Sequence, residues 1–387
     1  MSESKRIRDF GIVIGKMKPG KMNCLTDVPG VKVAHVTVSD GPVQTGVTAI
    51  MPRADNVYRH KVMGAVDVIN GFGKSIGLMQ VEELGTIETP ILLTNTLSVG
   101  LAADALVEYM LQENPEIGTV TGTVNPLVCE CNDGYLNDIR GRHVTRVHVL
   151  EAIERAKSAA SCDPGETGAA IQPEAVSEGS VGAGAGMSCY HLKGGIGTAS
   201  RIMEVSESIQ EGEKNPSSSA FTLGVLVLTN FGKRRDLIID GKKIGPEVTS
   251  LEKMDRQALM QDAPEKGSVI IVMGMNLPVS ERQLKRIARR AVVGLVRTGS
   301  YLGTGSGDVV LAFSTANGTP HFDEAGFNTW QVLNEDKMDI PFRAAAEATE
   351  EAVLNSLAAA AYCQGRDGHY RVALKDYLER ILPSLKH

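Results

Sequence analysis

The pair Gly267–Ser268 places a hydroxyl nucleophile at the first position of an apolar strand. A polar turn ends at Gly267, and the run from Ser268 to Val272 is apolar and rich in β-branched residues. A serine at this position can attack the carbonyl of the preceding residue, and glycine there leaves that approach unobstructed. Cleavage would free the α-amino group of Ser268, whose ordinary pKa of about 7.7 to 8 lets it act as the base for its own hydroxyl. The same pair is also a common start of an ordinary strand.

A second serine lies in a G-x-S-x-G sequence, which is typical of the nucleophile elbow of serine hydrolases. The sequence is Gly73-Lys74-Ser75-Ile76-Gly77, and His321 or His369 could serve as its base. Asn70 and Gly71 just upstream favour a loop instead of the sharp turn between strand and helix that an elbow needs. Ser75 is therefore the weaker of the two nucleophile candidates.

Three binding motifs are incomplete in this chain. A phosphate loop would need glycine where Val68 stands, and the glycine-rich run 179–187 is followed by Cys189 where a dinucleotide fingerprint needs its third glycine. Cys129 and Cys131 have no further ligands at a zinc spacing. We therefore expect no metal and no organic cofactor.

The elements that must hold these residues alternate between strands and helices. Apolar runs of strand length recur between turn residues, and amphipathic patterns lie between them. The expected strands are 62–69, 90–93, 118–124, 221–228, 269–273 and 309–313, and the expected helices are 99–111, 145–160, 281–297 and 344–362. This mixture predicts a layered α/β or α+β protein. We interpret the polar stretches 161–183 and 210–219 as surface loops within one domain.

The clearest local unit lies between residues 267 and 315, and it would hold Ser268 in place. Ser280 and Gln283 form the capping box of a helix, and Gly299 is placed to end it. The apolar residues of this helix recur at three- and four-residue steps, while its opposite face is basic. A solvated cationic face accounts for the basic residues better than a nucleic-acid site does.

Length and composition exclude several classes of protein. The chain has 387 residues, 42% hydrophobic and 22% charged, with a net charge of -6. These values exclude disorder, and the interspersed charges argue against a nucleic-acid partner. The longest apolar stretch is too short to span a membrane, and the charged amino end does not resemble a secretory signal. We therefore predict a cytoplasmic protein with reduced cysteines.

Motifs spread over nearly the whole chain point to one family. They are TDVPGV (26–31), TGVTA (45–49), NGFG (70–73), ECNDGYLND (130–138), KGGIGTASR (193–201), GSVIIV (267–272), ARRA (288–291), RTGS (297–300), GSGD (305–308) and LAFSTAN (311–317). In their content and order they resemble the DmpA-type family of L-aminopeptidase/D-esterases and β-peptidyl aminopeptidases. Members of this family are N-terminal-nucleophile hydrolases that mature by self-cleavage.

The resemblance implies catalytic roles for four residues. Ser268 matches the nucleophile, which becomes the first residue of the smaller fragment. Ser306 and Asp308 match the polar pair beside the nucleophile, and Asp308 stands where some members carry Glu. Asn230 matches the asparagine that stabilises the oxyanion, although an asparagine before Gly232 can also simply form a turn.

The resemblance also implies a substrate pocket around Glu130 and Tyr135. A carboxylate at Glu130 would pair with the free ammonium of the first substrate residue, so the enzyme would remove terminal residues. The alternative is structural, because Asp133-Gly134 is typical of a turn and Tyr135 of a packed aromatic residue.

The fold implied by the resemblance is a single four-layer αββα sandwich over residues 1–387, of the N-terminal-nucleophile-hydrolase type. Self-cleavage between Gly267 and Ser268 would divide it into 1–267 and 268–387, which stay associated. The implied activity is an aminopeptidase or amidase acting through a seryl acyl-enzyme, in a homo-oligomer for which a tetramer is favoured. The alternatives are an acyltransferase of the ornithine-acetyltransferase type and a non-enzymatic small-ligand-binding protein.

Overall fold

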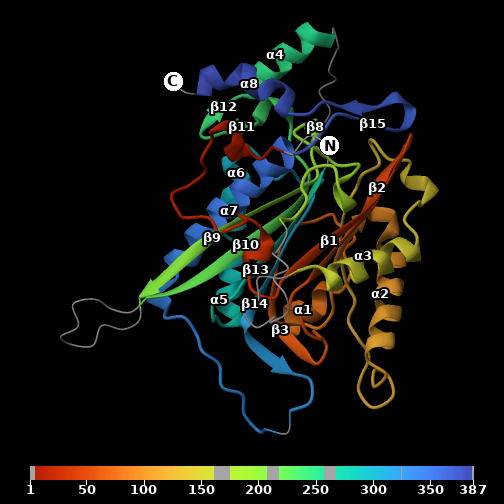
Figure 1. Ribbon diagram of the computed structural model, residues 1–387, viewed down its shortest axis with the longest axis vertical. Helices are drawn as coiled ribbons and strands as arrows, with labels where there is room; N and C mark the ends of the chain where they lie inside the picture. Colours follow the sequence, from red (N-terminus) through yellow and green to blue (C-terminus); the bar gives the residue numbers. More distant parts are fainter. Residues whose placement is uncertain (1–4, 161–174, 207–217, 257–266, 324, 386–387) are drawn as a thin grey trace, which may run out of the picture.

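Two β-sheets pack face to face, and helices cover the outer surface of each, which gives four layers in the order αββα (Figure 1). The computed structural model describes residues 5–160, 175–206, 218–256, 267–323 and 325–385. The predicted αββα sandwich is confirmed. No helix in the described part of the chain is long and apolar enough to cross a membrane.

The larger sheet carries the Ser268 strand at its centre. Its strands are β3 (His60–Gly71), β4 (Thr86–Ile87), β9 (Ile196–Ser206), β10 (Ser218–Asn230), β13 (Ser268–Met275) and β14 (Gly307–Pro320). They lie in the order β4-β3-β14-β13-β10-β9, with β13 parallel to β14 and antiparallel to β10. β13 therefore has a neighbour on each side, and the ends of β10 and β14 flank its first residue.

The smaller sheet lies against the inner face of the larger one. Its strands are β1 (Lys32–Asp40), β2 (Val43–Met51), β5 (Ile91–Asn95) and β6 (Leu127–Cys131), in that order. Three short two-stranded pairs complete the described strands: β7 (Ser188–Cys189) with β8 (Leu192–Lys193), β11 (Ile238–Ile239) with β12 (Lys242–Lys243), and β15 (Cys363–Gln364) with β16 (Tyr370–Arg371).

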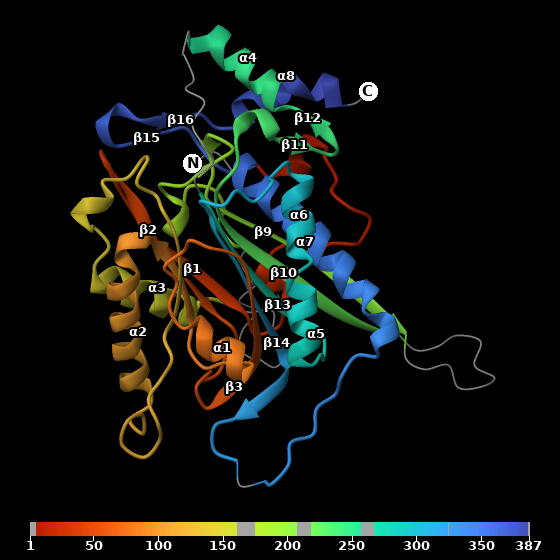
Figure 2. The ribbon, with the colours of Figure 1, turned by 180° about the vertical axis from the view of Figure 1, so that it is seen from behind.

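Helices cover the two outer faces. The helices of the described residues are α1 (Leu78–Leu84), α2 (Val99–Glu113), α3 (Arg146–Ser158), α4 (Gly245–Arg256), α5 (Glu281–Ala288), α6 (Ala291–Arg297), α7 (Asp339–Ala358) and α8 (Lys375–Leu385). Of these, α4 and α8 lie side by side at one end of the sandwich (Figure 1, Figure 2). In both views α5, α6 and α7 lie on the outer side of the larger sheet, and α2 and α3 lie on that of the smaller sheet (Figure 2).

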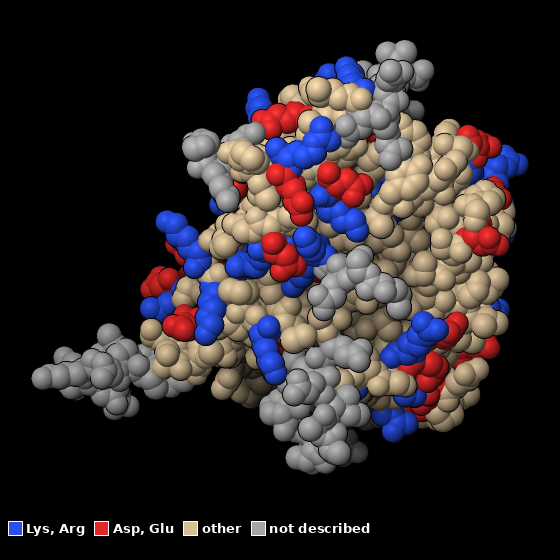
Figure 3. Space-filling model, turned by 45° about the horizontal axis from the view of Figure 1, so that its top comes forward, with Lys and Arg blue, Asp and Glu red and all other residues tan. Residues whose placement is uncertain are grey.

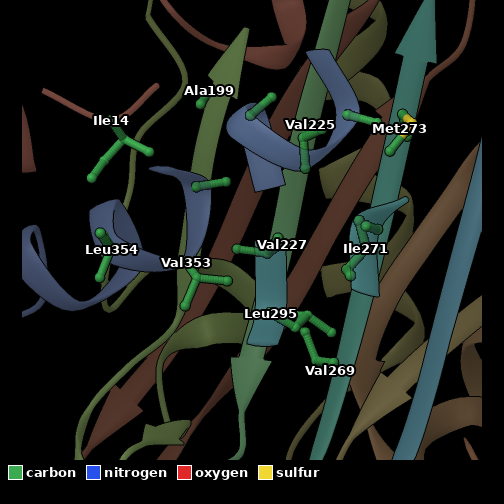
Figure 4. Packing of buried hydrophobic residues seen from close by; sticks show 14 of the residues in the cluster. Ile14, Ala199, Val225, Val227, Val269, Ile271, Met273, Leu295, Val353 and Leu354 are labelled. Atoms are coloured by element: carbon green, nitrogen blue, oxygen red, sulfur yellow. The ribbon is translucent and has the colours of Figure 1, made fainter. Parts of the chain in front are cut away.

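Three hydrophobic layers hold the sandwich together, one between the sheets and one beneath each helical layer. Between β13 and the helices, Val269 and Ile271 pack toward Leu295 of α6 and Val353 of α7 (Figure 4). Every residue of β13 is buried, because both faces of this strand are covered. A strand covered on both faces has a continuous apolar sequence, and this is why β13 could be predicted from its residues.

Two predicted elements were wrong. Residues 118–124 form turns with one isolated bridge, Ile117 to Thr121, and Val120 is 82% exposed. The two glycines of that run break the strand that its apolar residues suggested. The predicted helix 281–297 is divided into α5 and α6. At the division the N–H of Arg290 bonds to the carbonyl oxygen of Ile287, three residues back instead of the four of an α-helix.

The ends of that helical unit and the other long helices are close to the predictions. Ser280 and Gln283 form the predicted capping box, and Gly299 has a φ of +102° after the last turn. α7 begins earlier than predicted, at Asp339, and ends at Ala358. Most of the predicted loops 161–183 and 210–219 lies outside the described residues.

Acidic and basic side chains lie close together on the surface (Figure 3). On the basic face of α5, Arg282 and Arg286 both bind Glu335, and Lys285 binds Glu82. Acidic neighbours therefore neutralise much of the positive charge of this face, in agreement with its interpretation as a solvated helix surface.

Candidate active site

Ser268 lies at the point where three strands of the larger sheet meet. It is the first residue of β13 and only 8% exposed. In the register of the sheet it is opposite Asn230, the last residue of β10, and Gly307, the first residue of β14. The structure thus brings the predicted nucleophile directly beside the predicted oxyanion residue.

The hydroxyl of Ser268 contacts the peptide bond that precedes it. Its Oγ donates a hydrogen bond to the carbonyl oxygen of Gly267 at 2.7 Å. The backbone N–H of Gly307 lies 3.2 Å from the same carbonyl oxygen and 3.2 Å from Ser268 Oγ. A donor aimed at a carbonyl oxygen stabilises the negative charge that develops there when the carbon is attacked. Gly307 was not among the predicted site residues.

Glycine is required at two positions around the nucleophile. A Cβ on Gly267 would lie 2.3 Å from the carbonyl oxygen of Asn230, and a Cβ on Gly307 would lie 2.5 Å from the backbone nitrogen of Gly73. Close packing of backbones is therefore a further reason for glycine at position 267, besides the predicted access of Ser268 to the carbonyl. The GSGD motif held the signal for Gly307, because a glycine opening a strand often marks such an approach.

Ser306 and Asp308 form a hydrogen-bonded pair next to β13. Ser306 Oγ donates to Asp308 Oδ1, which also accepts the N–H of Val269 at 3.1 Å. Asn70 Nδ2 donates to the other carboxylate oxygen at 2.9 Å. Burial raises the pKa of Asp308, and its hydrogen bonds from Ser306 and Asn70 oppose that rise. The pair fixes the start of β13 through its backbone.

Asn230 is held on both sides of its amide. Its Oδ1 accepts the N–H of Ser188 at 3.0 Å, and its Nδ2 donates to the carbonyl oxygen of Asn132 at 2.9 Å. An amide nitrogen carries two hydrogens, so one remains for a ligand in front of Ser268. The residue is thus oriented by its neighbours, as an oxyanion donor must be.

Glu130, at the end of β6, lies beyond Gly307 as seen from Ser268. A Cβ on Gly73 would lie 3.5 Å from Glu130 Oε1 and 3.6 Å from Gly307 Cα, so Gly73 lies between the carboxylate and the first residue of β14. Glu130 is 2% exposed, and it accepts hydrogen bonds from the Lys74 N–H at 2.8 Å and from the Thr96 hydroxyl. The G-K-S-I-G run is the loop that positions Glu130.

Tyr135 lies in the loop after β6, three residues beyond Asn132, whose carbonyl oxygen accepts the hydrogen bond from Asn230. It is 40% exposed, and its ring stacks on His369 with a centroid separation of 4.6 Å. The guanidinium carbon of Arg371 lies 3.5 Å from the Tyr135 ring centroid. Sequence reasoning missed Arg371, which is far from Tyr135 in the chain.

The structure does not support an elbow at Ser75. Ser75 lies in the loop between β3 and α1, and neither candidate base is hydrogen-bonded to it in the described residues. His321 stacks on Tyr58 at 4.3 Å, and His369 stacks on Tyr135. Cys129 is fully buried, and burial raises the pKa of its thiol to about 12.

Asp133 is a buried acid within the Glu130–Tyr135 block, where the sequence suggested an ordinary turn. Its Oδ1 accepts a hydrogen bond from Asn137 at 3.0 Å, and Oδ2 has no hydrogen-bond partner among the described residues. Burial raises the pKa of Asp133 to about 7. The pKa of Asp133 is higher in the folded than in the unfolded chain, so its protonated carboxyl stabilises the folded state at low pH. This contribution is lost as the pH rises toward 7 and the folded state must bury a charge.

Asp133→Asn is therefore expected to become more stable than the original chain as the pH rises. Between pH 4.5 and 7.5 the difference in free energy of unfolding should move by roughly 2 to 4 kcal/mol in favour of the variant. Denaturation curves of both proteins at the two pH values measure it. Asp138→Asn is the control: Asp138 is a half-buried acid after the same loop, and its hydrogen bond with His143 lowers its pKa, so this replacement should gain no relative stability as the pH rises. Parallel pH dependences of the original chain and Asp133→Asn would contradict the assignment.

Comparison with known proteins agrees with this arrangement. The model of Peptidase family S58 matches residues 23–371, which is most of the chain. This chain belongs to peptidase family S58. A beta-peptidyl aminopeptidase of Sphingosinicella microcystinivorans is 36% identical over 384 residues, covering 95% of this chain and 89% of that protein. The resemblance to the DmpA-type family is therefore confirmed.

Solved structures extend the S58 relationship to the fold. A crystal structure of a Pyrococcus horikoshii OT3 protein has a TM-score of 0.84 at 46% identity, covering 99% of this chain and 100% of that one. The L-aminopeptidase D-Ala-esterase/amidase of Ochrobactrum anthropi, a variant of the Ntn-hydrolase fold, has a TM-score of 0.83 at 32% identity, covering 98% and 99%. The S58 chain thus has the predicted N-terminal-nucleophile-hydrolase fold.

Proposed function

We propose that this protein is a serine aminopeptidase that removes the first residue from short peptides, amides or esters after cutting its own chain before Ser268. The observation that carries the proposal is the contact of the Ser268 hydroxyl with the Gly267 carbonyl, between Asn230 and Gly307, in an S58 chain. The same oxygen would then serve in two reactions, first self-cleavage and then hydrolysis of substrate.

Self-cleavage begins with attack of Ser268 Oγ on the carbonyl carbon of Gly267. The Gly307 N–H, 3.2 Å from the carbonyl oxygen, stabilises the oxyanion. The peptide C–N bond breaks as the Ser268 nitrogen takes up the proton of the hydroxyl, which leaves an ester between Gly267 and Ser268. Water hydrolyses this ester to a Gly267 carboxylate and a free Ser268 amine.

In substrate hydrolysis the Ser268 amine is the base. It accepts the proton of the Ser268 hydroxyl as Oγ attacks the carbonyl carbon of the first substrate residue, and it passes that proton to the leaving amine. Asn230 donates its free amide hydrogen to the oxyanion. Water then releases the first residue from the seryl ester. Ser306 and Asp308 hold the start of β13 while this happens.

Glu130 gives the reaction its selectivity for free amino ends. Its carboxylate is almost fully buried beside the nucleophile strand and retains acceptor capacity beyond the bonds from Lys74 and Thr96. A substrate whose ammonium binds there would present the carbonyl of the same residue to Ser268. Tyr135 would line the other side of the pocket.

Glu130→Gln is expected to weaken the preference for free over acetylated substrates. A hydrogen bond to a charged group is worth about 1.5 to 3 kcal/mol, so the original enzyme should favour an amino-acid anilide over its N-acetyl derivative at least about tenfold in kcat/KM. The variant should bring the two rates close together and still cut its chain, because self-cleavage involves no substrate amine. Equal turnover of both anilides by the original enzyme would contradict the aminopeptidase proposal.

The remaining expectations stay predictions. They are the division into fragments 1–267 and 268–387 within one domain, a tetramer or other homo-oligomer, and a cytoplasmic location. Nothing in the described residues favours the acyltransferase or the small-ligand-binding protein over the aminopeptidase.

A further inference from the structure

Arg371 is a half-buried cation without an acidic partner at the edge of the active site. Its Nε donates to Ser188 Oγ at 3.1 Å, and its Nη1 donates to the carbonyl oxygen of Tyr370 at 3.2 Å. No carboxylate of the described residues is within ion-pair distance of it. Burial lowers the pKa of Arg371, since its charge is only partly solvated. A cation in this position is best satisfied by an anion from outside the chain.

Contacts through the sheet place Arg371 on the leaving-group side of Ser268. Ser188, which binds Arg371, also donates its backbone N–H to Asn230 on β10. Glu130 lies on the other side, next to β14, and β10 and β14 flank β13 on opposite edges. A substrate with its ammonium at Glu130 and its carbonyl at Ser268 therefore continues toward Arg371.

A second arginine, Arg234, lies near Arg371 and already has an acidic partner. Arg234 is ion-paired with Glu252, and the charge of Arg371 contributes to lowering the pKa of Arg234. The two guanidinium groups are thus close enough to interact, and only Arg234 has an acidic side chain bound to it among the described residues.

The hairpin of β15 and β16 holds Arg371 and Tyr135 in fixed positions. Arg366 donates its Nε to the carbonyl oxygen of Gly134 at 2.7 Å and its backbone N–H to that of Leu136 at 2.8 Å. His369 Nδ1 lies 2.8 Å from the Tyr135 carbonyl oxygen. In both ribbon views this hairpin lies near the end of β2, on the side of the 132–137 loop (Figure 1, Figure 2). A guanidinium fixed in this way is preorganised for a ligand.

We propose that Arg371, with Ser188 and Tyr135 beside it, binds the carboxylate of the leaving residue, so that dipeptides with a free carboxyl end are the preferred substrate class. Guanidinium presents five N–H donors in a plane that matches a carboxylate, and the bonds from Nε to Ser188, from Nη1 to Tyr370 and to the Tyr135 side chain leave donors available. Glu130 and Arg371 would then bind the two ends of one dipeptide. This inference rests on the proposed aminopeptidase function and adds the substrate class.

The test compares alanyl-alanine with alanyl-alaninamide, which differ only in the carboxylate. The original enzyme should hydrolyse the acid with a kcat/KM at least about tenfold above that of the amide. In Arg371→Met the ratio should fall to about one, and Arg371→Lys should retain part of it, because Lys keeps the charge without the planar fork. Arg282→Met is the control: it removes an exposed cation of α5 that is paired with Glu335 and has no part in the site, and the ratio should stay high.

Each outcome separates the inference from the function on which it rests. If the original enzyme hydrolyses both dipeptides equally well, or if Arg371→Met keeps the preference for the acid, the carboxylate subsite is wrong and the aminopeptidase stands. The first comparison needs no variant, so it decides the matter even if Arg371→Met does not fold. If neither dipeptide nor the anilide is hydrolysed in a Ser268-dependent manner, the proposed function fails and the subsite with it.

Discussion

Replacing Ser268 with alanine is expected to leave the chain whole and to abolish hydrolysis. Alanine removes the oxygen that lies 2.7 Å from the Gly267 carbonyl oxygen, so neither the internal ester nor the acyl-enzyme can form. Loss of a nucleophile of this kind lowers kcat by about 10⁴-fold or more. Gel electrophoresis of the denatured variant and an assay with an amino-acid anilide measure the two effects.

Ser75→Ala is the matched control for this variant. Ser75 occupies the competing G-x-S-x-G sequence, and its side chain has no hydrogen-bond partner among the described residues. The control should cut its chain and hydrolyse the anilide as the original does. Loss of both activities in Ser75→Ala, with Ser268→Ala still active, would reverse the assignment of the nucleophile.

Asn230→Ala is expected to give the second largest loss. Removing one oxyanion donor lowers kcat by about 10² to 10³, with a smaller change in KM, because the donor acts on charge that develops in the transition state. Self-cleavage should be slowed less, since the Gly307 N–H already contacts the Gly267 carbonyl oxygen. A time course of chain cleavage in the variant measures the first reaction, and a steady-state assay of the cleaved variant measures the second.

Asn276→Ala is the matched control, because Asn276 lies at the other end of the β10–β13 pair. Asn276 Oδ1 accepts the N–H of Thr222 at 2.7 Å, as Asn230 Oδ1 accepts that of Ser188. The control thus loses the same type of structural hydrogen bond far from Ser268, and its kcat should change little. If Asn230→Ala and Asn276→Ala have equal kcat values, the oxyanion is stabilised by other groups.

Strand β13 could be predicted from the sequence for a physical reason, whereas the layer order came from the family resemblance. β13 is covered on both faces, so all of its positions are buried and it appears as an uninterrupted apolar run after a polar turn. Several motifs that carry the family resemblance, namely NGFG, ECNDGYLND and GSGD, lie at the ends of strands, where the backbone leaves the core. Those two signals were enough to place Ser268 and Asn230.

Strand β9 shows why other elements escaped prediction. It contains Arg201, which is fully buried and pairs with Glu347 and Glu351 of α7. A charged residue argues against a core strand when its partners, about 150 positions away along the chain, are unknown. The strand is stable because α7 supplies the opposite charges, and only the folded chain shows this.

The active site itself depends on contacts that no local pattern contains. Gly73 separates Glu130 from Gly307, and Arg371 reaches Tyr135 from the far end of the chain. Each of these contacts is set by sheet register and by the path of loops. The sequence could therefore nominate Glu130 and Tyr135 through the family resemblance, whereas Gly307 and Arg371 required the structure.

The measurement that tests the central claim most directly is the mass of the purified, denatured protein together with the first residue of its smaller piece. The account predicts two fragments of roughly 28 and 13 kDa, in proportion to their shares of the 41.3 kDa chain, with Ser268 as the first residue of the smaller one. An intact chain of 41.3 kDa in a preparation that hydrolyses amino-acid anilides would contradict it, because Ser268 would then lack the free amine that the mechanism uses as its base.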